Sequence, residues 1–197
     1  MKLYDNPASP FCRKVKVLAH EAGMADDIEI AFSVGSPVNS EQMPTDHNPL
    51  SKIPTLVLAD GTSLFDSSVI TRFLNAKTGH KFCAADDHRN IRDESLANGI
   101  MEAAVSMVYE FRARPEGERS PAMVEALWGK VTRALDVIEN EPFGEQFNLS
   151  QIALACALGY LDFRHEDRGW REGRPKLSAW YEDVSKRPSM QATIPTV

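Results

Sequence analysis

The chain of 197 residues has little cysteine, no long apolar run and no visible export signal. Its three cysteines, Cys12, Cys83 and Cys156, include no Cys-X-X-Cys pair, which argues against a disulfide framework and favours a reducing compartment. No apolar stretch approaches the ~20 residues that cross a bilayer, so we expect no membrane-spanning segment. The N-terminus reads as a strand and not as a charged segment followed by an apolar one. We therefore expect a cytoplasmic protein.

The charge pattern argues against a nucleic-acid-binding surface. The net charge is −6 and the basic residues are scattered among acids, whereas phosphate contacts need clustered Lys and Arg. The five histidines show no metal-ligand spacing beside cysteines or carboxylates. We expect no nucleic-acid partner, no membrane partner and no metal. With 43% hydrophobic and 25% charged residues, the composition is that of a globular chain with a sizeable core.

The first part of the chain alternates strand and helix signals. Short apolar or alternating segments predict strands, a turn at Asp60-Gly61 predicts a hairpin, and helical spacing predicts two helices. A long loop rich in Pro, Gly and Asn separates the second strand from the hairpin. The expected strands are 2–4, 28–32, 53–58 and 63–65, and the expected helices start at Pro10 and after Asp66. This β-α-β-loop-β-β-α order predicts a thioredoxin-like α/β domain.

The second half shows only helical spacing. Residues 78–87 break the pattern, and we expect helices over 88–114, from Ser120 to before Pro142, from Asn148, and over 175–187. Asn148 and Gln151 fit a capping box, in which each side chain bonds the other's backbone N–H. The fold class is therefore α/β plus all-α. We expect a thioredoxin-like domain at 1–77, a linker at 78–87 and a C-terminal helical bundle at 88–197.

Ser9-Pro10-Phe11-Cys12 is the segment with the clearest chemistry. Ser9 is a suitable N-cap and Pro10 a suitable first helical residue, because proline lacks an N–H that would be unbonded there. Cys12 then stands in the first turn. The N-terminus of a helix carries roughly half a positive charge and favours an anion or a thiolate. The segment therefore predicts a site that handles a thiol.

Three segments occur in an order that resembles the cytosolic glutathione S-transferase superfamily. They are Ser9 to Cys12, the run Asn48-Pro49-Leu50-Ser51-Lys52-Ile53-Pro54, and Asp66-Ser67-Ser68 before a helix. The helical second half resembles the family too, and the S-P-F motif and Gly159 to Arg164 are similar to small bacterial members. The resemblance implies glutathione as co-substrate, a small hydrophobic electrophile as substrate, and a homodimer.

The resemblance also implies a role for each motif residue. A cis peptide before Pro54 would expose the N–H and C=O of Ile53 to the cysteinyl part of glutathione, where Pro54 would otherwise open an edge strand. The same comparison assigns the γ-glutamyl carboxylate to Ser67, the α-ammonium to Asp66, the glycyl carboxylate to Lys52, and a further glutathione contact to Phe11. Asp66 and Ser67 as a simple helix cap, and Lys52 as a solvated lysine, remain open. Ser51 departs from the family, which often has glycine there.

Ser9 stands where dithiol enzymes of the thioredoxin-like class have a cysteine, so an internal disulfide cycle is unavailable. Its hydroxyl is expected to donate a hydrogen bond to the glutathione sulfur, which makes Ser9 the catalytic residue. The thiolate would attack an electrophile held over the helical domain. Some of Met101, Val105, Met107 and Tyr109 are expected to line that pocket.

Two alternatives remain open on the sequence. Cys12 is a possible redox thiol that could form a mixed disulfide with glutathione, giving thiol-transferase or peroxidase activity, or it is a buried structural cysteine. The chain could also be a non-catalytic, protein-binding relative of the stringent starvation protein A type. That reading predicts loss of the glutathione-holding residues, whereas Ser9, Pro54, Asp66 and Ser67 are present.

Overall fold

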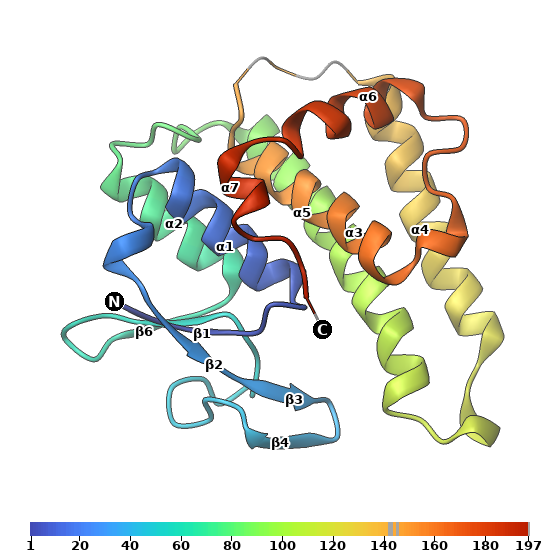
Figure 1. Cartoon of the computed structure of the whole chain (residues 1–197), viewed down its shortest axis with the longest axis horizontal. Helices are drawn as coiled ribbons and strands as arrows, with labels where there is room; N and C mark the ends of the chain where they lie inside the picture. Colours follow the sequence, from blue (N-terminus) through green and yellow to red (C-terminus); the bar gives the residue numbers. More distant parts are fainter. Residues whose placement is uncertain (142–143, 145, 197) are drawn as a thin grey trace. The chain divides into compact units, whose positions relative to one another are not determined.

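The computed structural model describes residues 1–141, 144 and 146–196. The chain divides into two compact units (Figure 1): Met1–Asp87 together with the segment from Pro188 onward, and His88–Arg187. Residues 78–87, expected as a separate linker, belong to the first unit because the buried Asn75 side chain donates to Cys83 O (2.7 Å) and accepts from Phe82 N–H (2.9 Å).

Residues 188–196 also differ from the expected domain limits. They were expected within the helical domain, and in the structure they pack with the first unit. Arg13 Nη2 donates to Met190 O (3.1 Å) across the contact of α1 (Pro10–Glu21) with the short helix α7 (Pro188–Gln191). This return of the chain leaves no periodic signal in the sequence, because a four-residue helix is shorter than one hydrophobic repeat.

The first unit is built on a four-stranded sheet with the order β2-β1-β5-β6. Its strands are β1 (Lys2–Asp5), β2 (Glu29–Phe32), β5 (Thr55–Val57) and β6 (Ser63–Leu64). β1 is parallel to β2 and antiparallel to β5, and β6 is antiparallel to β5. The thioredoxin-like order predicted from the sequence is confirmed.

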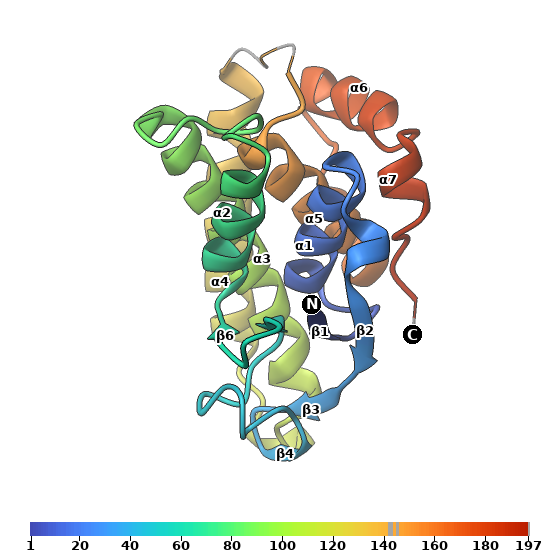
Figure 2. The ribbon, with the colours of Figure 1, turned by 90° about the vertical axis from the view of Figure 1, so that its left-hand side faces the viewer.

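Helices α1 and α2 (Ser67–Lys77) pack against each other beside this sheet (Figures 1 and 2). Apolar side chains from both helices and from the central strands make the core. Those with no exposed surface include Leu3, Leu56, Val15, Val17, Leu18, Ile70 and Leu74. Burying a side chain of this size contributes about 1.5–3 kcal/mol, so this core fixes where the two helices begin.

The long loop contains a small second sheet that the sequence analysis missed. β3 (Val34–Ser36) and β4 (Asn39–Gln42) form an antiparallel pair. A 3₁₀ turn at Ala25–Asp27 precedes β2. β4 is exposed along its whole length. A strand without a buried face has no alternation to reveal it, which is why composition indicated a loop.

The second unit is all-helical, as predicted. It comprises α3 (His88–Arg112), α4 (Pro121–Asn140), α5 (Leu149–Arg164) and α6 (Pro175–Val184), with 3₁₀ turns at Glu116–Glu118 and Glu166–Arg168. α5 is buried continuously from Leu149 to Leu161 and forms the centre of this unit. Pro142, expected to end the helix from Ser120, lies outside the described residues.

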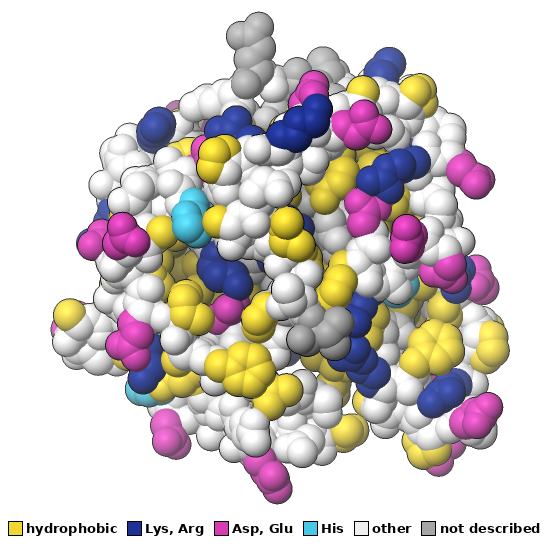
Figure 3. Space-filling model, in the orientation of Figure 1, with side chains coloured by type: hydrophobic (Ala, Val, Ile, Leu, Met, Phe, Trp, Pro, Cys, Tyr) yellow, Lys and Arg dark blue, Asp and Glu magenta, His cyan; other side chains and the backbone are white. Residues whose placement is uncertain are grey.

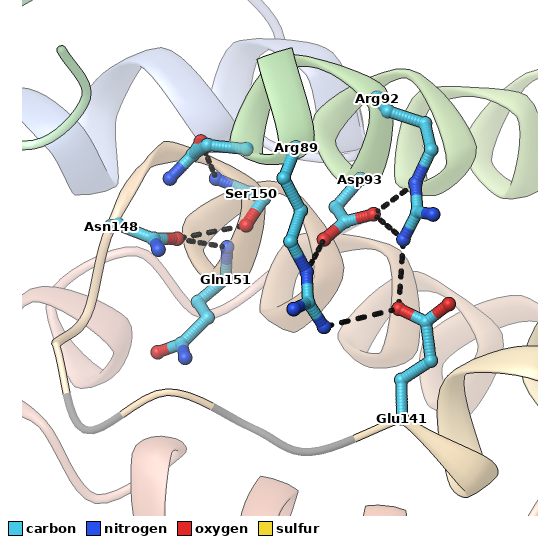
Figure 4. Close-up of polar contacts among 8 residues, drawn as sticks. Arg89, Arg92, Asp93, Glu141, Asn148, Ser150 and Gln151 are labelled. Atoms are coloured by element: carbon cyan, nitrogen blue, oxygen red, sulfur yellow. Dashed lines mark hydrogen bonds and ion pairs between the residues drawn. The ribbon is translucent and has the colours of Figure 1, made fainter. Parts of the chain in front are cut away.

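The start of α5 has half of the predicted capping box (Figure 4). Asn148 Oδ1 accepts from Gln151 N–H (3.0 Å), as expected. The prediction of the reciprocal bond, from Asn148 N–H to the Gln151 side chain, was wrong. Gln151 Nε2 donates to Gly144 O (2.7 Å), and Asn148 N–H donates to Gln146 O (2.9 Å). The carbonyls of Gly144 and Gln146, which precede the helix, thus accept from the two donors that the capping box would have paired differently.

The charged groups in Figure 4 lie at the surface. Arg92 pairs with Asp93 and with Glu141 (2.8 Å), and Arg89 also reaches Glu141 (3.7 Å). Exposed pairs of this kind contribute at most about 1 kcal/mol each. On the face drawn in Figure 3, acidic and basic side chains are likewise interspersed.

Candidate functional site

Ser9 caps α1 as the sequence predicted. Its backbone is extended (φ −83°, ψ 121°) and its Oγ accepts a hydrogen bond from Cys12 N–H (3.3 Å). Pro10 occupies the first turn, so the remaining helix N–H dipoles point toward the half-exposed Ser9 side chain. The cap uses a lone pair of Ser9 Oγ, so the hydroxyl keeps a proton that it can donate.

Cys12 is fully buried, with 0% of its surface exposed. Burial, reinforced by the charge of Asp5, raises the pKa of its thiol to about 12, although hydrogen bonds from Ser9 and the Asn6 backbone act in the opposite direction. A thiol with this pKa stays protonated at neutral pH. Mixed-disulfide chemistry needs an accessible thiolate, so this environment disfavours the redox role and suits a packed, structural cysteine.

The strand register brings the three sequence motifs to one end of the sheet. β5 and β6 pair Leu56 with Leu64 and Val57 with Ser63, so the chain that enters β5 from Ile53 and the chain that leaves β6 toward Ser67 lie at the same end of the pair. β1 pairs Tyr4 with Thr55, so the chain leaving β1 toward Ser9 emerges at the same end. Segments separated by more than forty residues therefore meet there.

Ile53 presents unengaged backbone at this end. The Ile53–Pro54 peptide is cis, as the resemblance implied. Across the described part of the chain, neither the N–H nor the C=O of Ile53 hydrogen-bonds to the protein, and the residue is only half-buried. An accessible donor and acceptor on one residue is the arrangement that pairs with the backbone of a peptide-like ligand.

Asn48 builds the loop that carries Ile53, a role that the sequence analysis missed. The Asn48 side chain is 1% exposed; its Nδ2 donates to Lys52 O (3.0 Å) and Thr55 Oγ1 (3.2 Å), and its Oδ1 accepts from Leu50 N–H (3.0 Å). Thr55 Oγ1 also donates to Lys52 O (2.9 Å). The Asn-Pro dipeptide signals a turn, but only the fold shows that its amide ties both ends of the loop.

Ser51 has a left-handed backbone (φ 52°). Such a conformation costs a non-glycine residue roughly 1–2 kcal/mol, whereas glycine adopts it freely. The loop geometry therefore favours glycine at this position, which accounts for the glycine that the family often has where this chain has Ser51.

Ser51→Gly is therefore expected to raise the free energy of unfolding by about 0.5–1 kcal/mol, after the larger backbone entropy of glycine is subtracted. Urea denaturation measures the change. Ser40→Gly, in a strand with ordinary backbone angles, is the matched control and should lower stability by a similar amount. Equal destabilisation by both substitutions would contradict the argument.

The start of α2 offers a second set of polar groups. Asp66 is the N-cap, with Oδ1 accepting from Ser68 N–H (2.9 Å) and Val69 N–H (3.4 Å). Ser67 is 3% exposed, and in the described structure neither its hydroxyl nor its N–H has a protein partner. A nearly buried hydroxyl and an N–H at the positive end of a helix suit a carboxylate.

The other two expected contacts are less enclosed. Lys52 is exposed and its ammonium has no ion pair within the described residues, while Phe11 is half-buried in the first turn of α1. Within the same residues, no three His, Cys, Asp or Glu side chains cluster as metal ligands would. None of the helices described there has both the length and the apolar character needed to cross a bilayer.

Both parts of the chain match models of one protein family. Residues 8–77 match the model of the glutathione S-transferase N-terminal domain, and residues 121–183 match that of the C-terminal domain. The GST-like protein YibF of Escherichia coli is 34% identical over 99% of this chain and 98% of its own length.

Two solved structures of a glutathione transferase family member from Pseudomonas fluorescens Pf-5 are similar over the whole chain. One, with bound glutathione, is 40% identical with a TM-score of 0.93 and covers 100% of this chain and 99% of the other. The second holds S-(propanoic acid)-glutathione and is 41% identical, with a TM-score of 0.92 and full coverage of both chains. This chain belongs to the glutathione S-transferase family.

Proposed function

We propose that this protein is a glutathione transferase in which Ser9 activates the glutathione thiol for attack on a small hydrophobic electrophile. The observation that carries the proposal is the set of unengaged polar groups at one end of the sheet, the Ile53 backbone and the buried Ser67. Ser67 is 3% exposed, and polar groups that are largely out of water normally have a partner, so its lack of one in the described structure favours a polar ligand.

Each expected contact has a matching part of glutathione. The γ-glutamyl carboxylate accepts from Ser67 at the start of α2, and the free Asp66 oxygen meets the α-ammonium. The Ile53 backbone pairs with the cysteinyl residue, which directs its sulfur toward the start of α1. Lys52 reaches the glycyl carboxylate and Phe11 lies beside the ligand. The relative crystallised with glutathione supports this cofactor.

The proposed chemistry is deprotonation of the bound thiol. A free thiol with a pKa near 8.5 is only a few per cent thiolate at neutral pH. The Ser9 hydroxyl and the positive end of α1 favour the anion; lowering the pKa by about two units takes roughly 2.7 kcal/mol. The S-substituted glutathione held by the second relative is what thiolate attack on a carbon would form.

The alternatives carried from the sequence are less well supported. The burial and raised pKa of Cys12 disfavour thiol transfer through that residue. A purely protein-binding relative would have no use for unengaged groups at Ile53 and Ser67. We further propose a cytoplasmic homodimer, which light scattering coupled to gel filtration would test.

Calorimetric titration with glutathione tests the proposal. The wild-type protein is expected to bind, and Ser67→Ala should weaken binding by roughly 10- to 100-fold, because it removes a hydrogen bond to a charged group. Ser40→Ala, which truncates an exposed serine of the same unit, is the control and should bind as the wild type does. Absence of glutathione binding by the folded wild-type protein would overturn the proposal.

A further inference from the structure

Strand β2 forms an open edge of the four-stranded sheet, because β1 is the one strand that pairs with it in the described part of the chain. Glu29 and Ser33 donate their backbone N–H groups to carbonyls of the chain along β1 (2.9 and 2.8 Å). Alternate residues of a strand face opposite sides, so Ile30 and Phe32 direct their N–H and C=O groups away from β1. The edge therefore offers two donors and two acceptors to a further strand.

The same two residues carry exposed apolar side chains. Ile30 is 49% and Phe32 is 68% exposed, and because they are two positions apart they lie on one face of the strand. Val34 (43%) lies at the start of β3, and Val38 (73%) lies in the turn that joins β3 to β4. Figure 3 shows hydrophobic side chains over β2 and β3. We call these four residues with the open edge of β2 the edge patch.

The edge patch lacks the usual protection of an open edge. Soluble proteins generally place a charged side chain or a proline on such a strand, which discourages pairing with other chains. In β2 the residues whose backbone faces outward are Ile30 and Phe32, both apolar. The charged residue of the strand is Glu29, whose backbone faces β1 and whose carboxylate pairs with Lys2 (3.5 Å). Apolar side chains beside unpaired backbone groups suit the addition of another strand.

The segment that carries the edge patch is acidic. Between Lys16 and Lys52 the sequence has six acidic residues and neither lysine nor arginine, which equals the net charge of −6 of the whole chain. Asp26 and Asp27 lie exposed on the 3₁₀ turn before β2, and Glu41 lies exposed on β4. None of these three carboxylates forms an ion pair with another described residue. Their negative charge favours a cationic ligand.

We propose that the edge patch binds a basic, extended segment of another protein, which adds to the sheet as a further strand beside β2. The backbone of this segment pairs with Ile30 and Phe32, and its lysine or arginine side chains meet the carboxylates of Asp26, Asp27 and Glu41. A second copy of this chain is disfavoured as the occupant, because two acidic segments repel each other. Nucleic acid and anionic lipid are disfavoured for the same reason. This binding does not depend on the proposed glutathione chemistry.

A peptide that alternates lysine with valine, blocked at both ends, is the probe, and fluorescence anisotropy measures its binding at low salt. We expect the wild-type protein to bind it and Phe32→Ser to weaken binding roughly tenfold or more, because the substitution removes the largest apolar side chain of the edge patch. Val137→Ser truncates a similarly exposed side chain (50%) on α4 and should bind as the wild type does. Both variants should bind glutathione as the wild type does.

Charge is tested by neutralising one 3₁₀ turn at a time. Asp26→Asn combined with Asp27→Asn should weaken peptide binding roughly fivefold or more at low salt, and the difference should shrink as salt screens the charges. Glu116→Gln combined with Glu118→Gln removes the same charge from the 3₁₀ turn at Glu116–Glu118 and should change binding little. The same peptide with every amide N-methylated keeps its charge but cannot donate to the strand, so it should bind roughly tenfold or more weakly.

Hydrogen exchange followed by NMR separates strand addition from a loose ionic complex. Saturating peptide should slow exchange of the Ile30 and Phe32 amides roughly tenfold or more, whereas the Glu29 amide, already bonded to Met1 O, should change little. Unchanged exchange, equal binding of the N-methylated peptide, or no binding at millimolar peptide would overturn the proposal. Self-association of the protein that Phe32→Ser abolishes would also overturn it, because the edge patch would then serve a second copy of this chain.

Discussion

Ser9→Ala is expected to lower kcat for conjugation of glutathione to an aryl chloride by roughly 10- to 100-fold, the loss of one hydrogen bond to a developing thiolate. Glutathione affinity should change little, because the γ-glutamyl and backbone contacts remain. The pKa of the bound thiol, followed by ultraviolet absorbance, should rise toward the ordinary value near 8.5. Activity at pH 6.5 should therefore fall more than activity at pH 9, where the thiol ionises unaided.

The chain supplies a control for the capping role of Ser9. Ser120 is also an N-cap followed by proline, with its Oγ accepting from Met123 N–H (3.2 Å). Ser120→Ala should cost the same ~1 kcal/mol of stability without changing the thiol pKa. Cys12→Ala should leave conjugation largely intact. Loss of activity in Cys12→Ala, with retention in Ser9→Ala, would transfer the chemistry to the cysteine.

Local signals predicted those parts of the site that depend on local interactions. A helix cap is decided within four residues, so Ser9 before α1 and Asp66 before α2 were predictable from residue type and position. The cis bond before Pro54 is different, because a proline alone favours the trans form. Only the resemblance to a family predicted it.

Features that depend on distant contacts were missed for a physical reason. The exposed strand β4 lacks a buried face, and Gln151 found a carbonyl at Gly144 that no capping pattern specifies. α3 and α5 also pack in parallel, with Asn90 beside Ser150 and Ala104 beside His165, a pairing that no local pattern specifies. Sequence periodicity specifies which face of a helix is buried, and not which neighbour it meets.

Asn48→Ala is expected to lower the free energy of unfolding by about 2–4 kcal/mol, since it leaves Lys52 O, Leu50 N–H and Thr55 Oγ1 with fewer partners in a buried loop. The same amide holds the chain on both sides of Ile53. In the fraction that stays folded, KM for glutathione should therefore rise at least tenfold while kcat falls less, because the thiol is activated elsewhere, at Ser9. Urea denaturation and steady-state kinetics at a temperature well below the transition measure the two effects.

Asn39→Ala provides the comparison for this substitution. Asn39 is exposed and its side chain makes a local bond with Glu41 N–H (3.0 Å), so its removal should change stability by less than about 0.5 kcal/mol and leave KM unaltered. If Asn48→Ala destabilised the protein but kept the wild-type KM, the loop would hold Ile53 in place without the Asn48 side-chain amide. The link between Asn48 and glutathione binding would then be lost, although its contribution to stability would remain.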